Sequence, residues 1–550
     1  MQDSITQENS SDKKTSSSVL KSAAMMSLGT LCSRVLGLVR DLVLAALFPR
    51  AVTDAFSAAF KLPNLFRRLL GEGSLSASFI PVFVDSITVK PGEDPESVKK
   101  RGQLLANAVF TWLAIITSCL SVLGVLFMPQ IMGLLVGHES YTEIEGKFEL
   151  TTLMGRVMFS YLFLVTTYAY FMGIMNAYGR FFLAALAPAG FNATLICFNF
   201  LPGFQMYGDQ LAWGVLAGGV VQLLLVAIPL RNMGKLPRLT TDLMVTGVRT
   251  VFKNMIPSML GMGVLQILTL MNVYFASQLE EGALTYIYLA DRLLELPQSL
   301  ISVSLGVALL PTLSRLWAEG RVEDMKKEAH KNIRLLLTLA LPSAVGLYLL
   351  SVPIIQVLFM RLEFTAQDAL ATASVLQIYA FLLITTSVHR VLVPNFYAKK
   401  DTRTPMLVSA VAVFSHYYVA SYGVEHHGLT GLISATLFTG TLSLALLYGA
   451  YYFNFGSLGL RKILFSVLKL LLPLVGMAIV AAYGYPLFEN LFLTLLGSLP
   501  KGVEFSARLL SLGLTIPLCI VVYFGLGVLS RHENITEALK LKKRRRNKKQ

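Results

Sequence analysis

Long runs of apolar residues, separated by short polar connections, extend through most of this chain. A transmembrane helix needs about 20 predominantly apolar residues, and about 14 of these runs are long enough. The pattern therefore predicts an all-α polytopic membrane protein with about 14 transmembrane helices, of which charges interrupt the second and the eighth. The predicted spans cover residues 20–48, 55–86, 104–136, 151–176, 182–203, 210–230, 252–278, 284–316, 332–360, 369–398, 405–423, 429–453, 463–486 and 506–530.

Positive charge is distributed unevenly among the connections. Lysine and arginine gather in every second connection, and the connections between them carry few of either. Because cytoplasmic loops are enriched in these residues, an even number of spans places both termini in the cytoplasm. The polar arm at 1–19 and the basic tail at 531–550 then lie on that side, and the first span is predicted to be retained rather than cleaved. The exceptions to the alternation are Arg50, Lys147, Arg361 and Lys501.

Two parts of the chain share matching residues in the same order. A Leu-Pro pair begins at Leu62 and again at Leu296, and an Asn-x-Tyr-x-basic motif begins at Asn176 and again at Asn395. These matches predict two six-helix repeats that share one orientation and enclose a cavity. The predicted domains are an N-lobe at 20–240, a C-lobe at 241–455 and an additional helix pair at 456–530.

The composition narrows the possible functions. The net charge is +15, yet only 14% of residues are charged and 54% are hydrophobic, whereas a soluble protein carries about 25% charged residues. The positive charge is therefore assigned to cytoplasmic loops, and no nucleic-acid partner is expected. The four cysteines lie in apolar segments without metal-ligand spacing. The sequence contains no phosphate-binding glycine loop and no serine nucleophile motif. We therefore expect no cofactor, no metal and no enzymatic activity.

Several charged and polar side chains lie inside the predicted spans. An arginine at the centre of a spanning helix costs roughly 2.5–3.5 kcal/mol on insertion scales, so a group of them must face one another or a water-filled cavity. Helical spacing puts Ser33, Gly37 and Arg40 on one face of the first span. Guanidinium groups bind phosphate oxygens through paired hydrogen bonds, so the cavity favours a diphosphate, although a peptide carboxylate also fits. The residues concerned are Ser33, Arg34, Arg40, Asp41, Asp54, Lys61, Asn64, Arg67, Arg68, Glu72, Asp291, Arg292 and Glu295.

A second interpretation of these residues is purely structural. Arg40 could pair with Asp41 or Asp54, and Arg292 with Glu295, so that the charges only hold the halves of the protein together. The cations of the group outnumber its carboxylates by a single charge. The preference for an anionic substrate therefore depends on the geometry of arginine more than on net charge.

The motifs around these residues resemble those of the MurJ (MviN) lipid II flippases, which belong to the multidrug/oligosaccharidyl-lipid/polysaccharide exporter superfamily. The likeness extends from about residue 20 to about residue 530. It implies two lobes that form a V, a central cationic cavity, and a groove at the last two spans for a polyprenyl tail. The matching motifs are Ser33-Arg34-Val35-Leu36-Gly37 with Arg40-Asp41, Thr53-Asp54-Ala55-Phe56, Phe60-Lys61-Leu62-Pro63-Asn64-Leu65 with Arg67-Arg68, and Ala290-Asp291-Arg292-Leu293 with Glu295. The resemblance implies substrate-binding roles for Ser33, Arg34, Arg40, Asp54, Asn64, Arg67, Arg292 and Glu295.

The function that the resemblance implies is transport of lipid II, an undecaprenyl-pyrophosphate-linked peptidoglycan precursor, from the cytoplasmic to the periplasmic leaflet of the bacterial inner membrane. Alternating access would move it without covalent chemistry. The partners are then lipid II and membrane lipids, with a coupling ion or the membrane potential as the source of energy. One alternative is an exporter of another polyprenyl-linked glycan or of drugs, and another is a polytopic glycan-transferring enzyme. The arginines argue against cationic drugs, and the short outer loops argue against the enzyme.

Overall fold

The computed structural model describes residues 29–496 and 503–536. Every regular element in these ranges is a helix, so the predicted all-α architecture is confirmed. The predicted polar arm at 1–19, residue Lys501 and residues 537–550 of the basic tail lie outside the described residues. The first helix covers residues 29–47. The following elements are α2 (Arg50–Phe66), the π-helical turn η1 (Arg67–Gly73), α3 (Ser74–Ile87), α4 (Pro95–Leu126), α5 (Met128–Val136), α6 (Glu139–Thr142), α7 (Lys147–Ala177), α8 (Phe181–Phe198), α9 (Gln210–Asn232), α10 (Val248–Ala276), α11 (Ala283–Ala318), α12 (Val322–Leu349), α13 (Ser351–Phe359), α14 (Ala366–Ala398), α15 (Arg403–Phe455), α16 (Leu460–Leu468), α17 (Leu471–Ile479), the π-helical turn η2 (Val480–Gly484), α18 (Tyr485–Leu496) and α19 (Val503–Leu529).

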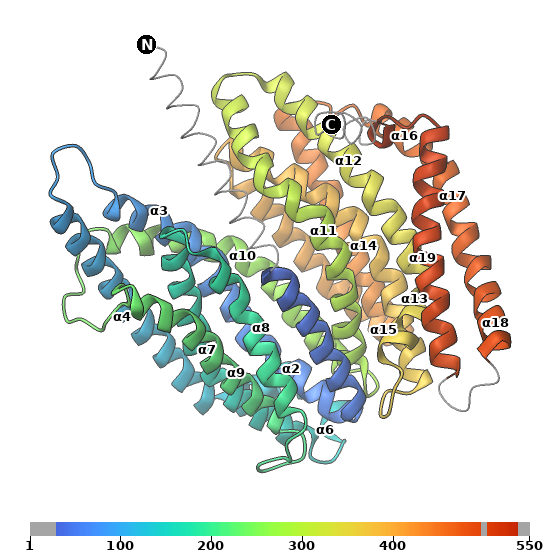
Figure 1. The fold of residues 1–550 in the computed structure, drawn as a ribbon, viewed down its shortest axis with the longest axis horizontal. Coiled ribbons are helices and arrows are strands. Elements are labelled where there is room, and N and C mark those ends of the chain that lie inside the picture. Colours follow the sequence, from blue (N-terminus) through green and yellow to red (C-terminus); the bar gives the residue numbers. More distant parts are fainter. Residues whose placement is uncertain (1–28, 497–502, 537–550) are drawn as a thin grey trace. The chain divides into compact units, whose positions relative to one another are not determined.

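The first of two compact units comprises residues Met1–Leu284 and is organised around α7. This helix packs against α2, α4 and α9, and 72% of its most apolar stretch is buried. Around it, α8 packs along α9, and α3 packs against α10 (Figure 1). Because protein rather than lipid surrounds most of α7, the helix can hold polar side chains whose partners come from neighbouring helices.

The second unit comprises residues Thr285–Gln550, with α14 packed between α12 and α15. The long helix α15 is broken at Gly428, whose φ of 57° and ψ of −133° are not helical. The break separates the predicted spans at 405–423 and 429–453. On either side of it the two backbones touch, because a Cβ added to Gly431 would lie only 1.9 Å from the carbonyl oxygen of Gly423. Only glycine fits such a close approach.

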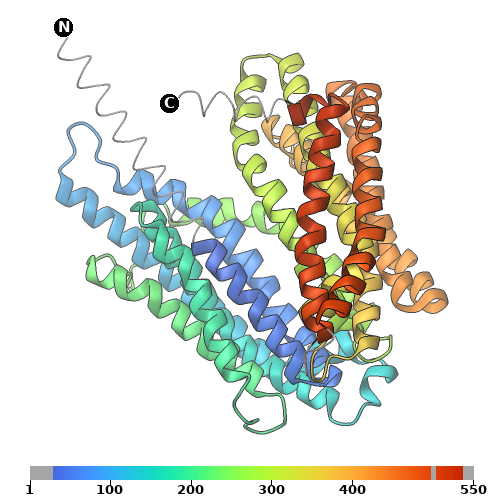
Figure 2. The ribbon, with the colours of Figure 1, turned by 45° about the vertical axis from the view of Figure 1, so that its right-hand side comes forward.

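The last helices of the chain are fastened to α12 within the second unit. α17 and α18 pack against α19, and both α16 and α17 contact α12 (Figure 2). Tyr523 of α19 donates a hydrogen bond from its hydroxyl to the carbonyl oxygen of Thr338, over 2.7 Å. Arg334 of α12 forms an ion pair with Glu533, which follows α19, at 2.6 Å. Within the second unit, the last helices are therefore joined to α12, and α19 also packs against α13.

Nine helices among the described residues are long and apolar enough to cross a membrane, which makes this a multi-pass membrane protein. The broken α15 counts once among them, and the predicted second span is divided into α2, η1 and α3. The total number of spans stays a prediction. The lobe boundaries at 240 and 455 also stay predictions, although α10, which lies after the first of them, packs against α3 in the first unit.

Candidate functional site: charged side chains on apolar helices

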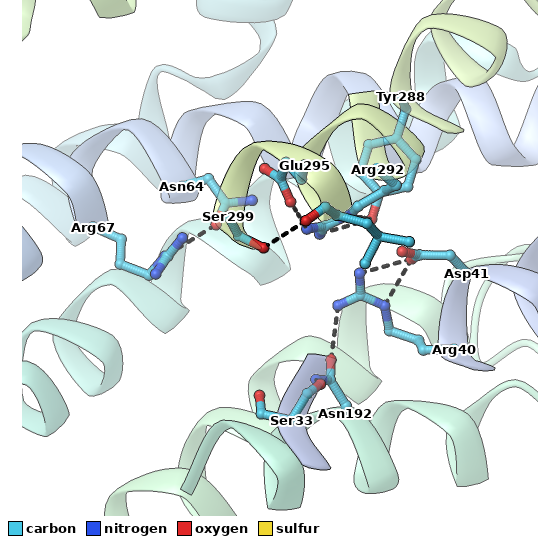
Figure 3. Close-up of polar contacts among 11 residues, drawn as sticks. Ser33, Arg40, Asp41, Asn64, Arg67, Asn192, Tyr288, Arg292, Glu295 and Ser299 are labelled. Atoms are coloured by element: carbon cyan, nitrogen blue, oxygen red, sulfur yellow. Dashed lines mark hydrogen bonds and ion pairs between the residues drawn. The ribbon is translucent and has the colours of Figure 1, made fainter. Parts of the chain in front are cut away.

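One asparagine of α8 contacts three successive turns of the first helix. Asn192 accepts a hydrogen bond from Nη1 of Arg40 at 3.0 Å and donates one from Nδ2 to the carbonyl oxygen of Ser33 at 3.1 Å. Between these positions, a Cβ added to Gly37 would lie 3.4 Å from Nδ2 of Asn192. The prediction that Ser33, Gly37 and Arg40 share one helical face is confirmed, and this face lies against α8 (Figure 3).

The guanidinium group of Arg40 is buried in protein contacts. Its Nε and Nη2 donate to Oδ1 of Asp41 at 3.0 and 2.7 Å, and the two residues are only 3% and 0% exposed. A buried arginine that contacts both a carboxylate and an amide oxygen is oriented rather than mobile. The pairing of Arg40 with Asp41 that the structural interpretation offers is observed. Arg34, on another face of the same helix, is exposed and Ser33 is half-buried.

A second group of polar side chains lies where α2 passes into a π-helical turn. Asn64 accepts a hydrogen bond from Nε of Arg67 at 3.2 Å (Figure 3). Pro63, one residue earlier, has no N–H and cannot continue the regular α-helical hydrogen bonding. The wider turn η1 begins at Arg67, and π-helical turns of this kind frequently occur at functional sites. Arg67 is half-buried and Arg68 is exposed, so both guanidinium groups can be reached from outside the helix.

In the second unit, α11 carries an arginine between a carboxylate and an aromatic ring. Nη1 of Arg292 lies 3.1 Å from Oε2 of Glu295, and Nη2 donates to the hydroxyl of Tyr288 at 3.2 Å. The guanidinium carbon lies 5.2 Å from the centre of the Tyr288 ring. The Arg292 and Glu295 side chains are 33% and 45% exposed. Because such pairs contribute only about 0–1 kcal/mol, an anionic ligand can replace the carboxylate of Glu295 at little cost.

Asp54 lies apart from these accessible groups, in the interior of the first unit. Its Oδ2 forms an ion pair with Nζ of Lys147 at 3.0 Å and accepts a hydrogen bond from the backbone N–H of Gly282 at 2.7 Å. Both side chains of the pair are 2% exposed. Asp54 is thus placed among protein groups, and a substrate contact at this position would first require the removal of those groups.

Three of the four charges that broke the predicted alternation have partners in the protein. Lys147 is the buried partner of Asp54, and Nη2 of Arg50 donates to the carbonyl oxygens of Ala45 and Phe48, both at 2.7 Å. Nη2 of Arg361 donates to a backbone carbonyl oxygen at 2.8 Å, and its guanidinium group lies over an aromatic ring. Because these charges have partners within the protein, they do not indicate on which side of the membrane their loops lie.

Sequence reasoning missed three residues that complete these groups: Asn192, Tyr288 and Lys147. Tyr288 lies one helical turn before Arg292, a spacing that places both on one face and that the sequence contains. Asn192 and Lys147 have no such local signal, because their partners are far away in the chain. Among the described residues, no group of His, Cys, Asp or Glu could hold a metal ion.

Of the arginines in the predicted polar group, Arg34, Arg67 and Arg68 in the first unit and Arg292 in the second are therefore accessible. Arg40 and Asp54 are held in the interior of the first unit. An apolar helix with accessible guanidinium groups favours an amphipathic ligand whose polar part is anionic, because each guanidinium can donate two parallel hydrogen bonds to a phosphate or carboxylate.

Comparison with known proteins identifies relatives along nearly the whole chain. The model of one protein family, described as "Lipid II flippase MurJ", matches residues 43–501. A "Probable lipid II flippase MurJ" of Bdellovibrio bacteriovorus is 43% identical over 97% of this chain and 98% of its own length. One from Rhizobium meliloti is 30% identical, over 93% of this chain and 94% of that protein.

Solved structures show the same fold. The structure entitled "Lipid II flippase MurJ, inward closed conformation" matches with a TM-score of 0.72 and 22% identity, over 92% of this chain and 99% of the other. An inward-facing multidrug resistance transporter of the MATE family matches with a TM-score of 0.60 and 16% identity, over 78% of this chain and 95% of the other. At these identities the structural likeness concerns the arrangement of helices.

Proposed function

The chain belongs to the family of MurJ lipid II flippases, and from this premise we propose that it carries lipid II from the cytoplasmic to the periplasmic leaflet of a bacterial inner membrane. Transport proceeds by alternating access without covalent chemistry, and both termini lie in the cytoplasm. Lipid II is an amphipathic diphosphate, which matches the combination of apolar helices and accessible guanidinium groups described above.

The proposal is supported mainly by the accessibility of Arg34, Arg67 and Arg292 on helices that are otherwise largely apolar. A guanidinium group in lipid is unfavourable, and one that contacts a diphosphate gains charge-assisted hydrogen bonds. These three arginines bind the diphosphate, while Ser33 and Asn64 bind polar groups nearby. Glu295 holds Arg292 in place until phosphate oxygens displace its carboxylate.

Arg40 acts differently, since its guanidinium group is already occupied by Asp41 and Asn192. We assign it the task of fixing the first helix against α8, so that Arg34 is presented on another face of that helix. The energy for the outward step comes from the membrane potential or from a coupled ion, which acts on the charges within the spans.

The proposal is tested with purified protein in liposomes that contain fluorescent lipid II. Arg34→Ala removes a diphosphate contact, and we expect the flipping rate to fall at least tenfold. Arg34→Lys keeps the charge without the paired donors, so it should recover only part of the rate. Arg156→Ala is the matched control, because Arg156 is an exposed arginine of α7 outside these groups.

The control should keep the wild-type rate. A wild-type protein that leaves lipid II in its original leaflet, under conditions in which it is folded and correctly inserted, contradicts the proposed function. Equal rates for Arg34→Ala and Arg156→Ala would retain the function and refute the role of Arg34.

A further inference from the structure

The second unit has a groove on the hairpin of α15 that plays no part in the transport described above. The groove has a volume of about 300 Å³, and residues of both helices on either side of the break at Gly428 line it. We propose that it binds one phospholipid whose headgroup carries a phosphate and an ammonium group. An acyl chain lies in the groove, and the headgroup lies at the tip of the hairpin, residues 424–428.

The groove exists because its floor lacks large side chains. Gly423 and Gly431 face each other across the hairpin, so closely that a Cβ added to Gly423 would lie 2.7 Å from the carbonyl oxygen of Gly431. Ala435, one turn further along, is 1% exposed and adds only a methyl group. Tyr422 and Phe438 line the same groove with large rings that are 61% and 47% exposed. Small residues beside large ones thus leave a channel that no described side chain fills.

The length of the groove fits one leaflet of a bilayer. The hairpin is apolar enough to span a membrane and the groove is open to its surroundings, so lipid is its neighbour. The residues deepest in the groove, Val419 and Phe438, lie nine and ten residues from Gly428. This is a depth of about 14–15 Å at 1.5 Å per residue. One leaflet supplies half of a hydrocarbon core of about 30 Å, so the groove extends along one acyl chain.

Polar groups occupy only the end of the groove near the tip. His427 and Thr430 lie within two residues of Gly428, and Ser434 follows Thr430 by one helical turn, whereas the deeper lining residues are apolar. All three polar side chains are exposed. Imidazole and hydroxyl groups in an apolar medium are unfavourable without hydrogen-bond partners. A phosphate near the tip accepts hydrogen bonds from the His427 ring and the Ser434 hydroxyl, which orients the lipid with its headgroup at the tip.

The tip itself is held in place by local contacts. His426 stacks on the ring of Tyr422 with the ring centres 4.2 Å apart, and its Nδ1 donates to the carbonyl oxygen of Tyr422 at 3.0 Å. The Thr430 hydroxyl donates to the carbonyl oxygen of His427 at 2.9 Å. His426 is thus turned towards the helix, and His427 is the imidazole that lines the groove.

The charge of the tip selects the headgroup. Residues 424–428 include Glu425 and two histidines but no lysine or arginine, so the predicted orientation places the tip on the outer side of the membrane. An ammonium group gains an ion pair with the exposed carboxylate of Glu425, while His427 binds the phosphate. A headgroup with only negative charge would be repelled by this carboxylate. The tip therefore favours phosphatidylethanolamine over phosphatidylglycerol in the outer leaflet.

Native mass spectrometry of the purified, delipidated full-length protein tests the site. The dissociation constant of the first bound lipid is measured for phosphatidylethanolamine and for phosphatidylglycerol with the same acyl chains. We expect phosphatidylethanolamine to bind at least fivefold more tightly. Ser434→Trp fills the groove, and should weaken this binding at least tenfold. Thr441→Trp is the matched control, because Thr441 is an exposed residue of the same helix outside the groove, and should stay within twofold of wild type.

Two results would overturn the proposal. Equal affinities of Ser434→Trp and Thr441→Trp would show that lipid only coats the hairpin without a specific site. Equal binding of the two lipids by the wild type would refute the assigned headgroup. Glu425→Gln should reduce the preference for phosphatidylethanolamine to less than twofold, and a preference that persists in this variant contradicts the role of the carboxylate.

A variant of the exposed tip decides the matter if Ser434→Trp does not fold. His427→Ala combined with Glu425→Gln should weaken phosphatidylethanolamine binding at least fivefold, and unchanged binding overturns the proposal. The same spectra report the competing occupant, a second copy of this chain. A wild-type dimer without bound lipid, which Ser434→Trp dissociates, would assign the groove to a contact between helices and refute the lipid site. None of these measurements involves lipid II, so their outcome is independent of the proposed function.

Discussion

Replacement of Asn192 by alanine should loosen the first helix from α8. The side chain makes two hydrogen bonds to that helix, one from the charged guanidinium of Arg40 and one to the neutral carbonyl of Ser33. A hydrogen bond to a charged group contributes about 1.5–3 kcal/mol, and a neutral one contributes about 0.5–1.5 kcal/mol. We therefore expect the free energy of unfolding to fall by about 2–4 kcal/mol.

The same change should weaken lipid II binding, because Arg34 follows Ser33 on the helix that Asn192 holds. The free energy of unfolding is measured by reversible denaturation of the purified protein in detergent, and lipid II affinity by native mass spectrometry. Gln222→Ala is the matched control. It removes another amide between two helices, where Gln222 of α9 accepts a single bond from the Tyr161 hydroxyl at 3.3 Å.

One neutral hydrogen bond predicts a loss of about 1 kcal/mol for this control. If Asn192→Ala is no more destabilising than Gln222→Ala, the hydrogen bond to Arg40 contributes nothing to stability and the expected difference is absent. If stability falls as expected but lipid II affinity is unchanged, the position of the first helix does not affect substrate binding.

Three further changes have defined outcomes. Glu295→Gln should alter the free energy of unfolding by less than about 1 kcal/mol, because its pair with Arg292 is partly exposed, and lipid II affinity measured by titration should not fall. Burial and the positive charge of Arg334 lower the pKa of His532 below its ordinary value of about 6.5. As the pH falls below about 6.5, His532 therefore binds a proton in the unfolded chain before it does so in the folded protein, and the free energy of unfolding decreases. In thermal denaturation between pH 5 and 8, the melting temperature of His532→Gln should fall less steeply with decreasing pH than that of the wild type. Gly431→Ala should lower the free energy of unfolding by about 1–3 kcal/mol, since the added methyl group meets the backbone of the opposing helix; an unchanged midpoint in detergent denaturation would contradict this.

Hydropathy and helical spacing were sufficient to predict the all-α architecture and the shared face of the first helix. The same information could not name the partner of that face, because lipid and a neighbouring helix are equally apolar environments for most side chains. Asn192 lies 152 residues from Arg40, and only the packing of α8 brings the two together.

In the candidate site, too, some pairings could be predicted from the sequence and others could not. Arg292 and Glu295 are three residues apart on one helix, so their pairing could be anticipated from the sequence and is observed. Asp54 could not be placed in this way, because its partners Lys147 and Gly282 come from other parts of the chain. Lys147 has the same charge as a lysine in a cytoplasmic loop, and only its burial reveals that it belongs to the interior.

The hairpin at Gly428 has a consequence for the way this protein reaches the membrane. Its two helices touch backbone to backbone at Gly423 and Gly431, which are only a few residues apart, so their contacts require no other part of the chain. Contacts between near neighbours form rapidly. The segment can consequently leave the ribosome, pair with itself and enter the bilayer as a preassembled unit, before the helices that follow it have been synthesised.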